Sequence, residues 1–235
     1  MKLAVMQPYL FPYFGYFQLI AAVDAFVVYD DVAFIKQGWI NRNRLKIGGQ
    51  AKFFTVPIAN ISSNRSIRDT QIAAVEYDRW LPKYLTTVSL NYRLSPHFQV
   101  IYPLVENLFR EKVGSVAELA RNSILLVMEY LGIHTRVVAS SSLYSNAGLE
   151  RAARLKDICR REGATHYYNL PGGAALYRKD DFATAGIALS FLSPRSLTYL
   201  QPGHQAFIPN LSILDVLMNV ERSIVCEHLK EFDLL

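Results

Sequence analysis

The sequence predicts an α/β fold in which helices cover a mainly parallel sheet. Three observations point to this fold. Short β-rich runs alternate with segments of helical spacing toward both ends of the chain. The first stretch of about thirty residues has the order strand, turn, helix, strand, which is the size of one βαβ unit. Between the two alternating parts lies a stretch that has helical spacing throughout. We therefore expect a Rossmann-like core with a helical subregion.

The N-terminal unit is predicted from its apolar spacing. Lys2–Gln7 is a short apolar run typical of a buried strand. The prolines of Pro8–Pro12 indicate a turn, because each fixes its backbone and lacks an N–H donor. Tyr13–Val23 has apolar residues every three to four positions, and Ala25–Tyr29 is rich in β-forming residues. We expect Tyr13–Val23 to be the crossover helix between two parallel strands.

The middle of the chain predicts a hairpin followed by helices. Trp39–Arg44 is expected to be a loop, and a hairpin then turns at Gly48-Gly49 and ends in Lys52–Ile58. Gly132 is placed to terminate the last of the helices. The three helical segments are Arg79–Leu90, Phe98–Phe109 and Val116–Leu131. They predict a helical lobe or insertion at about residues 79–131.

The rest of the chain returns to alternation. The expected elements are a strand at Arg136–Ala139, a helix at Leu149–Glu162 ending at Gly163, a strand at His166–Asn169, a helical turn at Lys179–Ala185, a strand at Ala188–Leu192 and a final helix near Ser212–Asn219. Strands separated by helices favour a parallel sheet. Because no repeat or Pro/Gly/Ser-rich linker interrupts residues 1–235, we expect a single α/β domain.

The composition favours a folded protein of the cytoplasm. Hydrophobic residues make up 51% of the chain and charged residues 19%, which supports a packed core. The longest apolar runs fall far short of the roughly 20 residues of a membrane-spanning helix. Gln7, Pro8 and Pro12 interrupt the apolar N-terminus, so it does not resemble a signal peptide. The 2 cysteines cannot form a disulfide framework. We expect no membrane partner, and nothing in the composition opposes a homo-oligomer.

The basic charge points to a small anionic ligand. The chain has a net charge of +5, but its basic residues are mostly scattered. The densest group is Lys36, Arg42, Arg44, Lys46 and Lys52. Nucleic-acid binding normally uses a longer basic stripe, whereas a nucleotide or phosphate needs only two or three such charges. We therefore expect a nucleotide-like ligand and no nucleic-acid partner.

The segment Gln7–Ile20 is the first candidate for a ligand site. It follows a predicted buried strand, and in open α/β sheets ligands bind beyond the carboxyl ends of the strands. Gly15 would let a ligand or a neighbouring backbone approach closely. The candidate ligand-binding residues are Gln7, Tyr9, Tyr13, Gly15 and Tyr16, whose tyrosines could stack on a base or sugar. The alternative is an aromatic plug of the core beside a proline-rich turn.

The segment Asp30–Arg44 is the second candidate. Asp30 and Asp31 follow a predicted strand and could orient an accepting amine or hydroxyl, although neighbouring strand residues point to opposite faces. Lys36 is a further catalytic candidate. The candidate ligand-binding residues are Trp39, Asn41, Arg42, Asn43 and Arg44, a set of amides and forked cations that suits phosphate or carboxylate. The alternative is a solvated basic loop with Asp30 as a cap.

Two further segments carry weaker signals. Asn210 or Ser212 could cap the last predicted helix, and a ligand-binding part for Gln201, His204 or Asn210 is the other possibility. Asp215 would lie in the first turn of that helix and favour its dipole. Gly172-Gly173 could cradle a phosphate or form an ordinary turn. The sequence has no dinucleotide-binding, Walker-type or nucleophile-elbow motif, and its histidines lack metal-ligand spacing, so we expect no metal ligands.

Taken together, four segments closely resemble the WbqC-like family, bacterial proteins associated with surface-polysaccharide (O-antigen) gene clusters. They are Met6–Ile20, Tyr29–Arg44, Arg154–Cys159 and Phe207–Asp215. The resemblance covers nearly the whole chain and implies a pathway more firmly than a reaction. Tyr168-Asn-Leu-Pro171 departs from it, because a Ser-Gly-Pro-like loop is expected there.

A looser resemblance is to nucleotidylyltransferases. Phe11–Ile20 is similar to their strand-to-helix signature, in which His-x-Gly-His follows a proline. Tyr13 and Tyr16 stand where that motif has histidines. A tyrosine, with a pKa near 10, supplies no positive charge at neutral pH. The resemblance therefore implies a related nucleotide-binding fold more than ordinary adenylyl transfer.

Three functions follow as hypotheses. The first is a transferase that modifies a nucleotide-activated sugar, in particular an amino sugar, with an acyl-type group, and needs no tightly bound cofactor. The second is nucleotidylyl transfer with Mg²⁺, in which Lys36, Arg42 or Arg44 would replace the charge of the absent histidines. The third is a binding subunit of a polysaccharide pathway without catalytic activity.

Overall fold

A six-stranded sheet forms the centre of the protein in the computed structural model, which describes residues 1–60, 64–201, 203 and 206–235. Its strands are β1 (Lys2–Met6), β2 (Ala25–Val28), β5 (Arg136–Val138), β6 (His166–Asn169), β7 (Ala188–Pro194) and β8 (Phe232–Leu234). They lie in the order β5-β2-β1-β6-β7-β8, and all neighbours are parallel except β7 and β8. Numbered along the chain, this is the Rossmann order 3-2-1-4-5-6. The expected fold class is confirmed.

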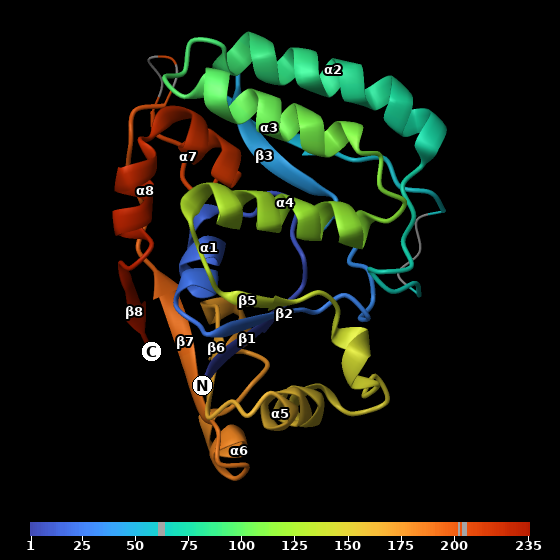
Figure 1. Cartoon of the computed structure of the whole chain (residues 1–235), viewed down its shortest axis with the longest axis vertical. Coiled ribbons are helices and arrows are strands. Elements are labelled where there is room, and N and C mark those ends of the chain that lie inside the picture. Colours follow the sequence, from blue (N-terminus) through green and yellow to red (C-terminus); the bar gives the residue numbers. More distant parts are fainter. Residues whose placement is uncertain (61–63, 202, 204–205) are drawn as a thin grey trace.

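Helices cover both faces of this sheet (Figure 1). Side chains alternate along β1, so that Ala4 joins one apolar cluster while Leu3 and Val5 join another. The first cluster includes α1 (Phe14–Ala21), α4 (Val116–Leu131), α7 (Ile213–Asn219) and α8 (Arg222–His228). The second includes α5 (Arg151–Arg161) and α6 (Lys179–Ala183). The expected crossover from β1 through α1 to the parallel strand β2 is therefore confirmed.

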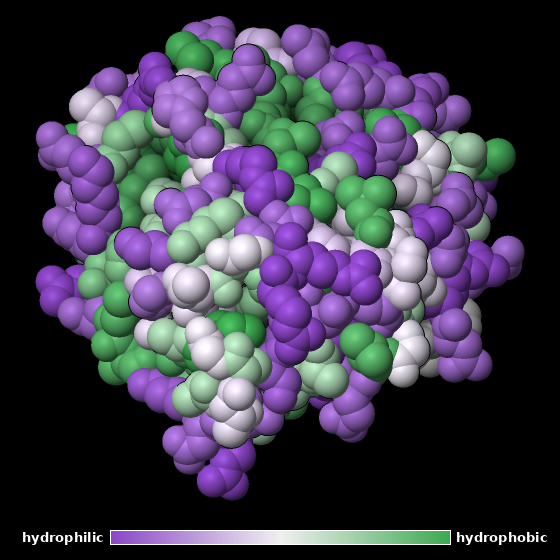
Figure 2. Space-filling model, turned by 60° about the horizontal axis from the view of Figure 1, so that its bottom comes forward, coloured by the Kyte–Doolittle hydropathy of each residue, from purple (hydrophilic) through white to green (hydrophobic). Residues whose placement is uncertain are grey.

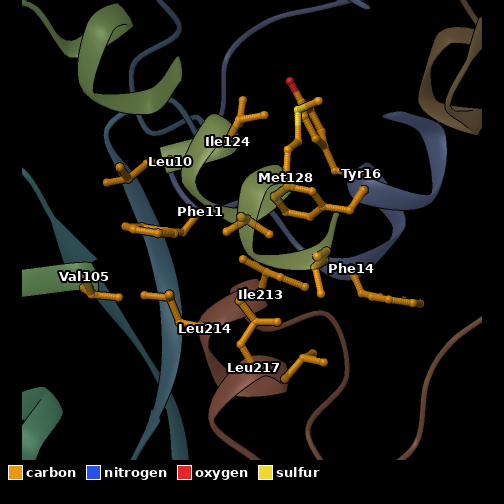
Figure 3. Packing of buried hydrophobic residues seen from close by; sticks show 14 of the residues in the cluster. Leu10, Phe11, Phe14, Tyr16, Val105, Ile124, Met128, Ile213, Leu214 and Leu217 are labelled. Atoms are coloured by element: carbon orange, nitrogen blue, oxygen red, sulfur yellow. The ribbon is translucent and has the colours of Figure 1, made fainter. Parts of the chain in front are cut away.

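The helices of the middle segment extend the first face. α2 (Ala74–Tyr92) and α3 (Phe98–Arg110) lie farther from the sheet than α4, which stands between them and the strands (Figure 1). α4 has the expected bounds, and Gly132 ends it in a left-handed conformation, as expected. Figure 3 shows the join: Phe11 and Tyr16 from the N-terminal unit meet Ile124 of α4 and Ile213 of α7. One apolar core thus unites the helical lobe with the sheet.

A separate hairpin carries part of the second candidate segment. It consists of β3 (Arg42–Ile47) and β4 (Gln50–Thr55), and its turn at Gly48-Gly49 is confirmed. Both turn glycines have a positive φ, as a tight two-residue hairpin requires. The expected loop at Trp39–Arg44 is wrong in its second half, because Arg42, Asn43 and Arg44 pair with β4. Because these three side chains are polar, the start of the strand was not predicted from the sequence.

The C-terminal end contains more structure than the sequence predicted. α7 is not the final element, since α8 and β8 follow it. β8 is only three residues long and gains its structure by pairing with β7, so it carried no local signal. Two short 3-10 helices, η1 (Ser141–Tyr144) and η2 (Pro171–Gly173), follow β5 and β6. Both therefore lie beyond the carboxyl ends of parallel strands.

The surface carries both hydrophilic and apolar residues. On the face shown in Figure 2, hydrophilic residues alternate with separate groups of apolar ones. Scattered apolar side chains are normal on a folded protein. Within the described part of the chain, no helix combines the length and the apolar character needed to cross a membrane.

Candidate functional site

A cavity of about 1000 Å³ opens where the strand order of the sheet reverses. From β1 the strand order runs through β2 to β5 at one edge of the sheet, and from β6 it runs through β7 to β8 at the other edge. The reversal therefore lies between β1 and β6. Gln7 follows β1 and lines the cavity, as do Asn169 at the end of β6 and Pro194 at the end of β7. In open α/β sheets this crevice at the carboxyl ends of the strands is the usual place for a ligand.

Arginines supply the charge of the cavity wall. Among the described lining residues the charged side chains are Arg44, Arg151 and Arg195, and none is acidic. Arg195 is paired with Asp233, with its Nη2 2.7 Å from Oδ1. Neither Arg44 nor Arg151 has a carboxylate partner within the described chain. The wall therefore favours an anionic ligand.

Arg44 is held in place but is not fully bonded. Its Nη2 donates to the backbone oxygen of Asn210 at 3.2 Å, and its guanidinium carbon lies 5.5 Å from the centre of the Trp39 ring. Its buried Nε has no hydrogen-bond partner in the described structure. A buried donor without a partner costs free energy. The charge of the guanidinium, which no carboxylate of the described chain neutralises, lies at the cavity wall.

The N-terminus of α1 meets the same cavity. Tyr13 is the N-cap residue, yet its side chain makes no capping hydrogen bond, and the first turn has no acidic residue. Phe14 and Gly15, the first residues of the helix, line the cavity. The backbone N–H groups of a helix N-terminus attract anions when no side chain caps them. This arrangement adds to the positive character of the wall.

The loop between β1 and α1, which carries Tyr9 and Tyr13, is rigidly fixed. Phe11 has a φ of 43°, a left-handed conformation that is uncommon for a bulky residue. Its N–H donates to Ser123 Oγ at 2.9 Å, and its carbonyl accepts from Ser212 Oγ at 2.9 Å and from Asn43 Nδ2 at 2.7 Å. The loop is thus preorganised before a ligand arrives.

The structure brings eight of the predicted site residues to the cavity wall. They are Gln7, Tyr9, Tyr13, Gly15, Trp39, Asn43, Arg44 and Asn210. Gly15 also serves the fold, because a Cβ at this position would lie 2.6 Å from Pro194. The glycine therefore lets α1 approach the end of β7. Six other predicted residues do not line the cavity: Tyr16, Asp30, Asp31, Lys36, Asn41 and Arg42.

Tyr16 and Asn41 belong to the interior. Tyr16 is fully buried, its ring centre is 5.7 Å from that of Phe26, and its hydroxyl donates to the backbone oxygen of Gln7. Asn41 donates from Nδ2 to the backbone oxygen of Val56. The core-plug interpretation therefore describes Tyr16, while Tyr9 and Tyr13 face the cavity.

Both aspartates of the second segment are engaged by other side chains. Asp30 Oδ1 accepts from Ser140 Oγ at 2.7 Å and from the N–H of Ser141 at 3.2 Å. Burial raises the pKa of Asp30, and these hydrogen bonds oppose the rise. Asp31 forms an ion pair with Arg154, which is only 4% exposed. The expectation that one of these carboxylates shares the cavity with the tyrosines is thus corrected.

Lys36 and Arg42 also lie outside the cavity. Arg42 donates from Nε to the backbone oxygen of Gly38 at 3.0 Å and from Nη2 to that of Gln37, and it lies over the Phe53 ring. Its guanidinium group therefore binds the loop before β3. Lys36 is exposed on that loop. Of the three cations expected near a phosphate, only Arg44 reaches the cavity wall.

Several lining residues were not predicted from the sequence. Tyr29 lines the cavity in place of the aspartates that follow it, with the guanidinium of Arg154 4.7 Å from its ring centre. Arg151 and Tyr177 contribute from α5 and from the segment after η2. A cation in the first turn of a helix interacts unfavourably with the helix dipole. This unfavourable position is the sequence feature that could have indicated a role for Arg151. Gly172 and Gly173, a weak candidate in the sequence, line the cavity as well.

The residues before α7 that were a weaker candidate in the sequence also line the cavity, through Phe207, Pro209, Asn210 and Leu211. Ser212 caps α7, as one of the two interpretations expected, and accepts from the N–H of Leu214. Asp215 is fully buried and accepts from the hydroxyls of Tyr92 and Tyr199. Gln201 donates to Asp215 Oδ2 at 3.1 Å, so its amide is engaged within the protein. His204 lies outside the described residues.

Comparison with known proteins gives one family and one curated relative. The model of the WbqC-like protein family matches residues 7–225. The chain is also similar to the uncharacterized protein Rv1507c of Mycobacterium tuberculosis (strain ATCC 25618 / H37Rv), with 29% identity over 221 residues. This alignment covers 93% of the chain and 94% of the relative. No solved structure matches.

Proposed function

Because the chain belongs to the WbqC-like protein family, we propose that its cavity binds a nucleotide-activated sugar and that the protein is a transferase acting on that sugar in surface-polysaccharide biosynthesis. One observation carries the proposal. Arg44, which has no carboxylate partner in the described chain, and the uncapped N-terminus of α1 belong to one cavity wall, in which no described side chain is acidic. This is the environment that a diphosphate requires.

The aromatic part of the wall suits the sugar and the base. Burial raises the pKa of Tyr9, and burial together with the nearby Tyr9 raises that of Tyr13 to about 12. Both hydroxyls therefore remain protonated at neutral pH and can donate hydrogen bonds to sugar oxygens. Their rings and that of Trp39 offer apolar faces for stacking.

The chemistry supported best is acyl-type transfer to an amino sugar. The described wall contains no histidine, cysteine, lysine or carboxylate that would act as a strong base or nucleophile. A neutral amine can attack an already activated acyl carbon without one: the C–N bond forms, the leaving group departs with its electron pair, and the amine proton passes to it or to water. In this proposal the protein aligns the two reactants, and Tyr9 or Tyr13 donates to the developing oxyanion.

The same wall favours one second candidate, a ligand-binding subunit without turnover, because it lacks those reactive groups. Nucleotidylyl transfer with Mg²⁺ gains less support: of Lys36, Arg42 and Arg44 only Arg44 lines the cavity, and no described lining residue is a carboxylate that would hold the metal. Calorimetric titration with UDP-, GDP- and dTDP-linked amino sugars tests binding. Incubation of the bound sugar with acyl-CoA and acyl-phosphate donors, followed by mass spectrometry, tests transfer.

We expect one nucleotide series to bind and its amino sugar to gain the mass of the acyl group. Binding without an acylated product across the donors would support the second candidate. Equal affinity for a nucleotide-sugar and for the free sugar would contradict both, because the phosphates would then contribute nothing.

A further inference from the structure

The cavity contains a second arginine that the proposed function does not use. Arg151 is the first residue of α5, whose buried residues Leu155 and Ile158 pack on one face of the sheet. Arg44 belongs to the hairpin, whose Leu45 and Phe54 join the apolar cluster of the opposite face. The two guanidinium groups therefore enter the cavity from opposite layers of the molecule.

The charge of Arg151 is not neutralised by the protein. No hydrogen bond or ion pair links it to any other residue that the structure describes, and its neighbours Arg154 and Arg161 are paired with Asp31 and Asp157. Arg151 also stands at the helix end where the dipole disfavours a cation, whereas Arg160 and Arg161 occupy the favourable end. Arg151 is exposed, so water solvates its charge, and a bound anion would offset the remaining unfavourable interaction with the dipole.

The surroundings of Arg151 supply further donors. Tyr177 lines the same part of the wall; burial raises its pKa, and the nearby Arg151 charge opposes the rise. Its hydroxyl has no hydrogen-bond partner among the described residues. The raised pKa keeps it protonated at neutral pH. Tyr29, backed by the buried Arg154, and Gly172 of η2 complete this end of the cavity. The end is thus built from neutral donors and one free cation.

The size of the cavity fits an extended ligand or two ligands. Small-molecule sites range from about 300 to 1,000 Å³. At about 1000 Å³ this cavity is at the upper limit. A diphosphate bound at Arg44 leaves room for a second group at Arg151.

We propose that Arg151 and Tyr177 form a second anion subsite, which binds a carboxylate or phosphate while the diphosphate of the nucleotide occupies the Arg44 end. This inference rests on the proposed binding of a nucleotide-sugar and specifies its class: the anion belongs either to the sugar, as a sugar acid, or to a co-substrate such as coenzyme A.

Matched ligands distinguish these sources. UDP-glucose and UDP-glucuronate, and GDP-mannose and GDP-mannuronate, differ in one carboxylate. Each would be titrated into the wild type, Arg151→Ala, Arg151→Lys and Arg160→Ala; coenzyme A would be titrated with the neutral nucleotide-sugar present. Arg160, like Arg151, is an exposed arginine of α5, but it does not line the cavity, so it controls for charge.

If the sugar carries the anion, Arg151→Ala should weaken binding of the acidic sugar by about ten- to a hundredfold and leave the neutral one unchanged. If the co-substrate carries it, the same loss should appear for coenzyme A. In either case Arg151→Lys should recover part of the affinity, and Arg160→Ala should change nothing.

Equal effects of Arg151→Ala on the neutral and acidic sugars, or no effect on any ligand, would overturn the second subsite. If the wild type bound no nucleotide-sugar, the proposed function itself would fail. A lowered melting temperature of Arg151→Ala would also contradict the inference, because removing an unpaired cation from a helix N-terminus should leave stability unchanged or slightly raise it.

Discussion

Arg42 and Arg44 lie on the same strand, yet their side chains have different surroundings. Arg42 and Arg44 are two residues apart on β3, so alternation places them on the same face of the hairpin. Arg42 nevertheless bonds to the backbone of Gly38 and Gln37, while Arg44 lines the cavity beside Trp39. Arg44 also donates to the backbone of Asn210, which lies far along the chain, so the two side chains end in different surroundings.

Alanine variants should separate these roles. Arg42→Ala loses two hydrogen bonds and its contact with Phe53, so we expect a loss of about 1–2 kcal/mol of unfolding free energy and little direct change in affinity. Arg44→Ala should cost less than about 1 kcal/mol of stability but weaken nucleotide-sugar binding by about 1.5–3 kcal/mol. Arg44→Lys should recover part of it. Urea unfolding and calorimetry measure both quantities. A stability loss without an affinity loss for Arg44→Ala would remove the main argument for a diphosphate.

The 2 tryptophans provide an internal reporter of binding. Trp39 lines the cavity and is 37% exposed, whereas Trp80 stacks on Tyr84 within the helical lobe. Ligand binding should therefore change the emission of the wild type and of Trp80→Phe but not that of Trp39→Phe. The opposite pattern in a fluorescence titration would place the ligand at the helical lobe.

At the scale of elements, α1 and the strands that flank the cavity are joined by close packing. Gly15 touches the end of β7 so closely that a Cβ would meet both Cβ and Cγ of Pro194 at 2.6 Å. Away from the cavity, Glu162 joins three elements: it accepts from the hydroxyl of Tyr144 in η1 at 2.6 Å and pairs with Arg136 of β5 just after the end of α5. Such contacts fix helices and strands relative to one another.

Gly15→Ala should therefore destabilise the protein although alanine is the better helix former. Overpacking costs about 1–3 kcal/mol, which exceeds the helical gain of up to about 1 kcal/mol. Gly172→Ala is the matched control, because a Cβ at this position would meet nothing within 4 Å and its φ is not positive. It should change stability by less than about 0.5 kcal/mol. Equal melting temperatures of the two variants would show that α1 can shift freely away from β7.

The contribution of Glu162 should depend on pH. Burial alone would raise the pKa of Glu162, but hydrogen bonds from Tyr144 and Arg136 and the charge of Arg136 lower it below its ordinary 4.5. A lowered pKa means that the folded state favours the ionised form, so the stabilisation is present above pH 4.5 and is lost as pH falls through the folded-state pKa.

Glu162→Gln should accordingly lose about 0.5–1.5 kcal/mol at pH 7 and converge with the wild type in acid. Urea unfolding over this pH range measures the difference. Glu129→Gln, at an exposed position of α4, is the control. A difference that grew as the pH fell would contradict the assigned role of Glu162.

At the scale of the whole molecule, the sequence predicted local elements well and non-local ones poorly. β6 and α4 were placed to the residue, because each has a clear run or period and a stop signal such as Gly132. β8 was missed because only β7 makes it a strand. The strand order itself depends on pairings between distant segments, and no local pattern encodes them.

For the candidate site, too, local features were predicted from the sequence and contacts between distant residues were not. Tyr9, Tyr13 and Arg44 were predicted as candidates because their segments are unusual in composition, and all three line the cavity. Asp30 and Asp31 were assigned to the ligand because Ser140, Ser141 and Arg154, which engage them, lie more than a hundred residues away. A sequence shows where polar groups are, but it does not show which of them satisfy one another.

The unusual conformation of Phe11 has a consequence for how the molecule assembles. The three side chains that hold its backbone come from positions 32, 112 and 201 residues away. Contacts of such separation form late, because each requires a long loop of chain to close. The cavity wall therefore cannot exist in any fragment or partly folded intermediate that lacks one of the three. Ligand binding should consequently report completion of folding along the entire chain, and a molecule damaged at Ser123 or Ser212, which hold the loop without lining the cavity, should lose its ligand before it loses its helices.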